Sequence, residues 1–111
     1  MSRDHRLFLE DIAEACEQTS HFIAGMTREQ FLADDKTRSA VERQVFVIAE
    51  ACNQVPDEIQ RRHPEIPWRQ IIGLRNVLAH GYWRIDPNVL WSTATERVPE
   101  LREQVRAMLS D

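Results

Sequence analysis

The residues best suited to chemistry lie in the second half of the chain, where Arg75 and Asn76 are followed shortly by His80. Histidine titrates near neutral pH and can accept or donate a proton. Arginine forms a bidentate contact with phosphate, and asparagine can donate to a phosphoryl oxygen or orient the arginine. Together they suit RNA cleavage without a metal, in which the 2′-hydroxyl attacks the adjacent phosphorus. We therefore treat Arg75, Asn76 and His80 as candidate catalytic residues.

Arg75 and His80 fall in a segment, at about residues 67–80, whose apolar spacing predicts a helix that Gly81 ends. On such a helix they lie less than about 10 Å apart along the axis and about 140° apart around it. Arg75 also interrupts an apolar stripe, where a guanidinium is costly unless it is paired or faces an interface. The simpler interpretation is an arginine that reaches water or pairs with an acid from another helix. The stripe consists of Trp68, Ile71, Ile72, Leu78 and Ala79.

The position of His80 at the predicted end of this helix also affects its chemistry. The negative end of the helix dipole raises the proton affinity of a histidine there, although His80 taken alone is better explained as a capping residue. One motif histidine supplies one proton-transfer group, whereas the reaction needs both a general base and a general acid. A two-fold dimer would bring two copies of His80 and Arg75 to one cleft. We therefore expect a homodimer.

The rest of the chain predicts an all-α protein: an up-and-down helical bundle of four main helices with short helical turns, which pairs as a two-fold dimer. The long helices are expected at about residues 3–25, 35–54, 67–80 and from Asp86-Pro87 to the end. Short helices should follow the Thr27-x-x-Gln30 capping box and cover residues 56–63. The helix at 35–54 should be central, because its run 45–49 is apolar in every direction. Pro99 should kink or split the last helix.

The bulk composition indicates one soluble globular domain over residues 1–111, with 42% hydrophobic and 29% charged residues. No apolar run approaches the roughly 20 residues that cross a membrane, and the first ten residues do not resemble a secretory signal. We therefore expect a cytoplasmic protein without membrane contact. Cys16 and Cys52 should be buried free thiols. No cysteine or histidine spacing fits a metal site, and the chemistry calls for no cofactor.

Charge is distributed unevenly along the chain. The net charge of −4 argues against nonspecific coating of nucleic acid, and we expect no DNA partner. Residues 60–84 nevertheless contain five arginines and one acid, which leaves −8 for the remainder. A cationic site on an acidic body suits brief contact with a phosphodiester, and the alternative is a chance cluster on a solvated face. Arg69, Arg84 and His63 are candidates for contacting the RNA backbone, and each is also explained as a solvated residue.

The sequence Pro67 to Tyr82, PWRQIIGLRNVLAHGY, resembles the signature of HepT proteins, members of the HEPN superfamily with its Arg-x(4–6)-His hallmark. The bare Arg-x4-His pattern is common by chance, but the longer string is specific. The resemblance covers nearly the whole chain, because Glu50-Ala51 resembles the family's Glu-Ala pair and the residues from Ile85 onward resemble its C-terminal helix. It implies a HEPN-type bundle, usually dimeric, that acts as an RNase toxin.

The resemblance also implies a partner and a means of control. HepT toxins are encoded beside a minimal nucleotidyltransferase, MntA, the antitoxin, which transfers AMP to the tyrosine two residues after the motif histidine. That tyrosine is Tyr82 here, and AMP on it would repel an RNA phosphate. Without the resemblance, Tyr82 is explained as a packing aromatic. Glu50, the one charge in the apolar run 45–52, is expected to pair with Arg75 or Arg43 and support the site's geometry.

Two functions remain open at this point. The first is a metal-independent endoribonuclease toxin that is neutralised by AMPylation of Tyr82, and the intact set of motif residues favours it. The second is a non-catalytic HEPN subunit that binds substrate or nucleotide within a nucleotidyltransferase complex, and the acidic overall charge favours it slightly. A third interpretation, a purely structural helical dimer, does not explain why Arg75 interrupts an apolar stripe.

Overall fold

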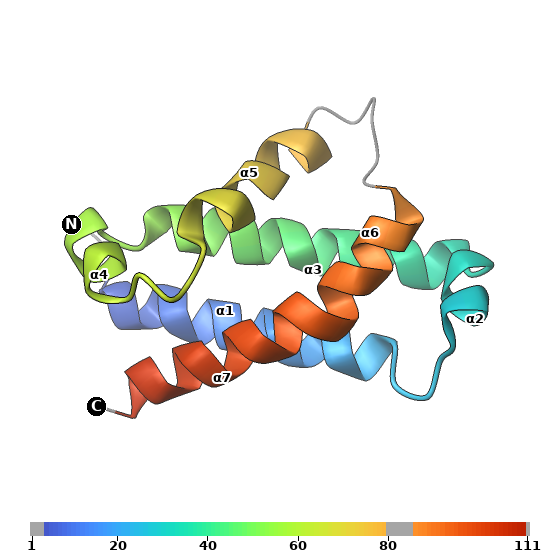
Figure 1. Cartoon of the computed structure of the whole chain (residues 1–111), viewed down its shortest axis with the longest axis horizontal. Helices are drawn as coiled ribbons and strands as arrows, with labels where there is room; N and C mark the ends of the chain where they lie inside the picture. The colour runs from blue at the N-terminus through green and yellow to red at the C-terminus, as the bar shows by residue number, and fades with distance from the viewer. Residues whose placement is uncertain (1–3, 80–85, 111) are drawn as a thin grey trace.

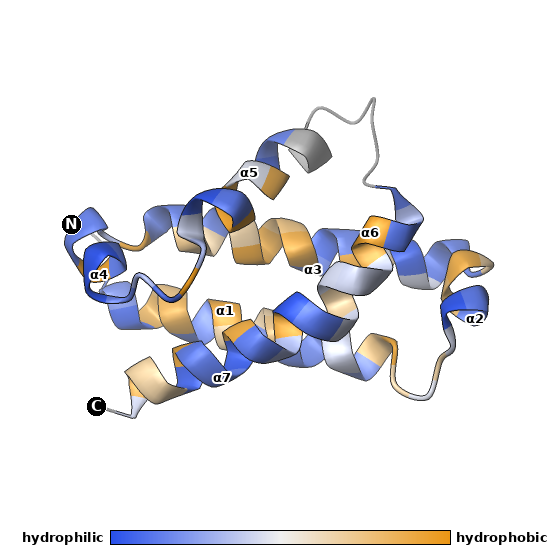
Figure 2. Ribbon diagram, viewed as in Figure 1, coloured by the Kyte–Doolittle hydropathy of each residue, from blue (hydrophilic) through white to orange (hydrophobic). Residues whose placement is uncertain are grey.

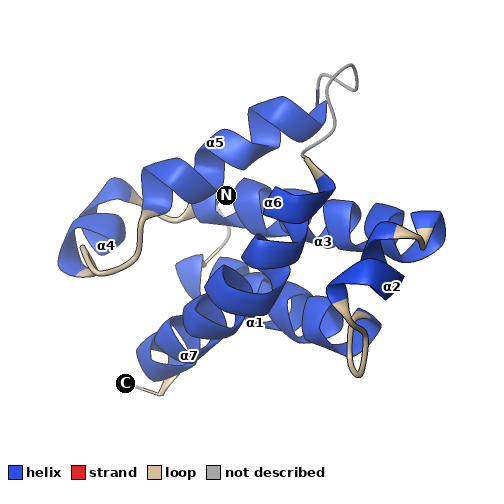
Figure 3. Cartoon of the chain, turned by 45° about the vertical axis from the view of Figure 1, so that its right-hand side comes forward, coloured by secondary structure: helices blue, strands red, loops and turns tan. Residues whose placement is uncertain are grey.

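The computed structural model describes residues 4–79 and 86–110, and all regular structure in these two ranges is helical (Figure 1, Figure 3). The long segments α1 (His5–Phe22), α3 (Asp35–Gln54) and α5 (Trp68–Ala79) alternate in direction (Figure 1). A fourth long segment consists of α6 (Pro87–Ser92), a π-helical turn (Thr93–Arg97) and α7 (Val98–Leu109). The expected all-α up-and-down bundle is confirmed, while the two-fold dimer stays a prediction because a single chain does not test it.

Two short helices occupy opposite ends of the bundle, α2 (Arg28–Leu32) and α4 (Asp57–Arg62) (Figure 1). The predicted capping box before α2 is present, since the Thr27 side chain accepts from the Gln30 N–H and the Gln30 side chain accepts from the Thr27 N–H. The Asp34 carboxylate caps α3 by accepting from the Thr37 N–H at 3.0 Å. The hydrogen bonds that the Asp34 carboxylate accepts from the backbone and side chain of Thr37 lower the pKa of Asp34.

Helix α1 is shorter at both ends than the expected range of 3–25. It begins after Asp4, whose carboxylate accepts from the Arg6 N–H at 2.9 Å. It ends at Phe22, and the chain turns at Gly25, which has a φ of 77°, a left-handed conformation that glycine adopts without strain. The first turn of α1 also touches the last turn of α7, because Arg6 Nη2 donates to the Leu109 carbonyl at 2.9 Å.

Helix α3 is central, as predicted, because it packs against α1 on one side and α5 on the other. Figure 2 shows the apolar middle of α3 between these helices. It is not buried all round, because Phe46 and Val47 remain partly exposed. Cys16 and Cys52 are buried free thiols in the larger core cluster, as expected, and burial raises the pKa of each thiol to about 12.

The last helical segment continues through Pro99, but a π-helical turn directly before this proline divides the segment into α6 and α7. The residues at the two junctions keep α-helical dihedral angles. A proline interferes with the carbonyl four residues earlier, and a wide turn relieves that conflict. The expected interruption near Pro99 therefore takes the form of this turn. Within the described ranges, no helix is both long enough and apolar enough to cross a membrane.

Candidate functional site

Helix α5 is fixed on the bundle by its first turn. Trp68 is 6% exposed and Ile71 is 3% exposed, and both belong to the larger core cluster. The indole Nε1 of Trp68 donates to the carbonyl of His63 at 3.0 Å, which ties the start of α5 to the end of α4. Leu74 packs against the second core cluster, formed around Phe31, Val41 and Val45. These contacts fix the rotation of α5 on α3, and therefore the position of Arg75.

Arg75 pairs with Glu50 of α3, as the lone charge in an apolar run predicted. The distance from Arg75 Nε to Glu50 Oε1 is 3.4 Å, and the two side chains are 28% and 42% exposed. The simpler interpretation of Arg75, an arginine paired with an acid from another helix, therefore holds within one chain. Arg43 does not take this place, because its guanidinium lies over the Phe46 ring, 5.8 Å from the centroid.

The ion pair with Glu50 orients the guanidinium of Arg75 and still leaves it partly exposed to solvent. Glu50 Oε1 lies 3.4 Å from Nε of Arg75, and the Arg75 side chain remains 28% exposed, so its guanidinium is accessible to a phosphate. Asn76 follows directly and is exposed. The structure thus brings Arg75, Asn76 and Glu50 to one part of the surface. His80, Tyr82 and Arg84 lie outside the described residues.

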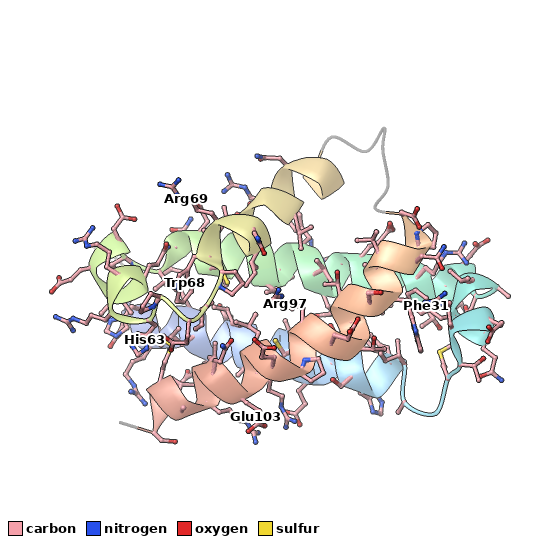
Figure 4. The ribbon with its side chains drawn as sticks, in the orientation of Figure 1. Phe31, His63, Trp68, Arg69, Arg97 and Glu103 are labelled. Carbon is pink, nitrogen blue, oxygen red and sulfur yellow. The ribbon has the colours of Figure 1, made fainter. Side chains whose placement is uncertain are left out.

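The other candidates for contacting RNA lie near the start of α5. Arg69 is exposed and points away from the body of the bundle (Figure 4). The His63 side chain lies 3.4 Å from the Glu65 carboxylate, so this histidine has a local partner. Arg69 lines a cleft of about 590 Å³ between α4, the connection at 64–67 and α5, and Arg61 lines it too. Arg61 belongs to the cationic stretch at 60–84, but nothing in its sequence context distinguishes it from the other arginines there.

In the part of the chain from 4 to 79 and from 86 to 110, no three histidine, cysteine or carboxylate residues are placed to hold a metal ion. The chemical groups that this part of the surface offers are the guanidinium of Arg75, the amide of Asn76 and the guanidinium groups of Arg61 and Arg69.

Comparison with known proteins identifies the family. A family model described as "Ribonuclease HepT-like" matches residues 12–108, from α1 to α7. The chain belongs to the HepT-like family. A protein of Thermococcus cleftensis named "Probable ribonuclease HepT" is 44% identical to this HepT-like chain over 102 residues, which cover 92% of the chain and 93% of that protein.

Other relatives match the HepT-like chain over similar lengths. "Putative RNase TTE0752" of Caldanaerobacter subterraneus is 33% identical over 94% of the chain and 93% of its own length. "Putative RNase MJ1216" of Methanocaldococcus jannaschii is 32% identical over 98% of the chain and 90% of its own length. No solved structure gives a significant match. The matched ranges confirm the HepT resemblance and carry no assignment of individual residues.

Proposed function

We propose that this HepT-like chain is the toxin of a toxin–antitoxin pair and acts as a metal-independent endoribonuclease. The observation that carries the proposal is the pairing of Arg75 with Glu50 on the surface of α5, next to exposed Asn76, in a chain of the HepT-like family. The pair presents the phosphate-binding edge of an arginine beside an amide donor, four residues before His80.

In the proposed reaction, one His80 removes the proton from the 2′-hydroxyl of the RNA. The freed 2′-oxygen attacks the adjacent phosphorus, and the bond from phosphorus to the 5′-oxygen of the next nucleotide breaks. His80 of the partner subunit gives a proton to that leaving oxygen, so the products are a 2′,3′-cyclic phosphate and a 5′-hydroxyl. Arg75 and Asn76 stabilise the negative charge on the phosphoryl oxygens during the transfer. A homodimer is needed because each chain brings one His80.

Control of the toxin is proposed to act at Tyr82, two residues after His80. A cognate MntA-like nucleotidyltransferase would transfer AMP to the phenolic oxygen of Tyr82 and neutralise the enzyme. The added phosphate carries negative charge, and its repulsion of an RNA phosphate would lower substrate affinity at a site built around Arg75. The support for this step is the HepT-like family together with the tyrosine in the His-x-Tyr position of this sequence.

The deciding experiment is RNA cleavage in EDTA by the purified, unmodified chain, with His80→Ala and Arg75→Ala measured in parallel. We expect the wild type to cleave mRNA or tRNA to cyclic-phosphate ends, and both variants to lose activity while circular dichroism shows unchanged helix content. Removing a proton-transfer group or a phosphate clamp typically costs about 100-fold or more.

Two outcomes would contradict the proposal. Full activity of either variant would show that the site lies elsewhere. No cleavage by a confirmed dimer with unmodified Tyr82, on both mRNA and tRNA, would favour the non-catalytic subunit that binds substrate or nucleotide in a nucleotidyltransferase complex.

A further inference from the structure

One face of α5 is exposed between the candidate catalytic residues and the cleft at the start of the helix. Arg69, Gly73 and Asn76 are all exposed. Steps of four and seven residues return to within about 40° of the starting direction on a helix, so these three residues share one face. This face differs from the apolar side of α5, where Trp68 and Ile71 are buried against the core.

Gly73 is the least expected member of this face. It lies inside a helix without a positive φ, where glycine destabilises the helix relative to alanine. A Cβ built on Gly73 meets no other atom within 4 Å, so no close packing within the described chain accounts for the glycine. What the glycine does provide is an uncovered backbone that another molecule can approach closely.

The end of this face opens into the cleft that Arg61 and Arg69 line. Within residues 4–79 and 86–110 neither arginine forms an ion pair, whereas the neighbouring Arg62 pairs with Glu58 at 2.6 Å. Asp57 also lines the cleft, which leaves a net charge of +1. Two unpaired guanidinium groups across a cleft suit the binding of phosphate.

We propose that this face is a track for single-stranded RNA, which runs from Asn76 over Gly73 to a phosphate-binding cleft between Arg69 and Arg61. The track is about 10 Å long from Asn76 to Arg69, the length of about three stacked nucleotides. This proposal rests on the proposed function, because it extends the contact with RNA beyond the phosphate that Arg75 is proposed to bind. The residues along it are polar or lack a side chain, which favours RNA over a second copy of the chain as the occupant.

The first test uses Gly73→Met in a His80→Ala background, so that the RNA is not cleaved during the measurement. Methionine is a good helix former and has open space here, so thermal melting should show a higher Tm. Its side chain would block the track, so fluorescence anisotropy should show about tenfold weaker binding of a single-stranded RNA of about 12 nucleotides. A merely structural role for Gly73 predicts a lower Tm with unchanged affinity.

The second test removes the two arginines of the cleft in Arg61→Gln/Arg69→Gln. If each contacts one phosphate, the slope of log affinity against log salt should fall by about 1.4 for single-stranded RNA. The matched control is Arg28→Gln/Lys36→Gln, which removes the same charge from exposed positions near α2, at the opposite end of the bundle (Figure 1). The control should keep the wild-type slope.

Three results separate this proposal from its alternatives. Wild-type affinity and salt slope in both the Gly73 and the arginine variants would overturn the track. A change from dimer to monomer in sedimentation of Gly73→Met would also overturn it, because a second copy would then cover this face. Weaker binding by these variants, in a chain whose wild type cleaves no RNA, would support the track while the proposed function fails.

Discussion

The ion pair between Arg75 and Glu50 explains the orientation of Arg75 better than it explains the stability of the fold. Both side chains keep contact with water, at 28% and 42% exposure. Pairs this exposed typically contribute less than about 1 kcal/mol to the free energy of unfolding. We therefore propose that Glu50 is a positioning residue, which holds the guanidinium of Arg75 for contact with RNA.

Replacing Glu50 with glutamine tests this role. We expect kcat for RNA cleavage to fall about tenfold, because a misplaced phosphate contact is costly in the transition state. KM should change less, and the free energy of unfolding should fall by less than about 1 kcal/mol. Steady-state kinetics and urea denaturation measure the two effects. Glu42→Gln, a similar charge change eight residues earlier on α3, serves as the control. Loss of stability without a change in kcat would show that Glu50 has a structural role alone.

Single residues were predictable where the local pattern was strong. Glu50 is the one charged residue in an apolar run. A charge that is expected to face the protein interior needs a partner, so the pairing of Glu50 could be predicted. The meeting of Arg61 and Arg69 at one cleft could not. It depends on the path of the connection at 64–67, which is fixed by the hydrogen bond from Trp68 to the His63 carbonyl. The catalytic roles of Arg75, Asn76 and His80, the supporting role of Glu50, and the roles of Tyr82, Arg69 and Arg84 stay predictions.

At the scale of the helices, boundaries were predictable where a capping residue and a stop both occur. Helix α3 has Asp34 before it and Pro56 just after it, and its expected range of 35–54 is confirmed. Helix α1 is shorter than expected because Ile23 and Met26 continue the apolar pattern into the turn, where they still pack against the second core cluster. Apolar spacing reports burial and does not by itself distinguish a helix from the turn that follows it.

In the C-terminal segment, too, apolar spacing does not by itself give the type of helix. Leu90, Ala94 and Val98 are buried at successive intervals of four residues. Intervals of four residues also occur along the buried stripe of an ordinary α-helix, so this spacing does not reveal the π-helical turn over Thr93–Arg97. The proline at 99 was the feature of the sequence that indicated an interruption there.

The packing of α1 on α3 predicts how stability depends on pH. Burial raises the pKa of the Cys16 and Cys52 thiols from 9.0 to about 12. Below pH 9 both thiols stay protonated in the folded and unfolded chain, so they add no pH dependence. Between pH 9 and 12 only the unfolded chain loses these protons, so the free energy of unfolding falls as pH rises. The fall should reach at most about 1.4 kcal/mol per pH unit for each thiol.

Urea denaturation between pH 7 and pH 10.5 measures this decline, with Cys16→Ala/Cys52→Ala for comparison. The double variant should be less stable at pH 7, because it loses buried volume, but its stability should decline less above pH 9. Parallel pH profiles for the two proteins would show that the thiols ionise equally in the folded and unfolded states.

At the scale of the whole molecule, the proposed function requires an acidic chain to bind an acidic polymer. The net charge of −4 opposes RNA over most of the surface. Arg61 of α4 and Arg69 of α5, which form no ion pair among the described residues, line one cleft at the start of the helix that carries Arg75. Binding should therefore be localised, brief and sensitive to salt.

The proposed dimer predicts how mixtures of subunits behave. If cleavage needs both copies of His80, a dimer of one wild-type and one His80→Ala chain is inactive. The activity of co-refolded mixtures should then be proportional to the square of the wild-type fraction. An equal mixture should keep about a quarter of the activity. Initial cleavage rates across a series of mixtures measure this, with Arg28→Gln as the neutral partner. A linear decline would show that each chain cleaves RNA by itself.

The contact between Arg6 and the Leu109 carbonyl holds the first turn of α1 beside the last turn of α7. A short linker could therefore join them into a ring, and new termini could be opened at the turn around Gly25, which lies at the other end of α1. Such a circular permutant would let two copies be tethered in defined geometry without altering α5.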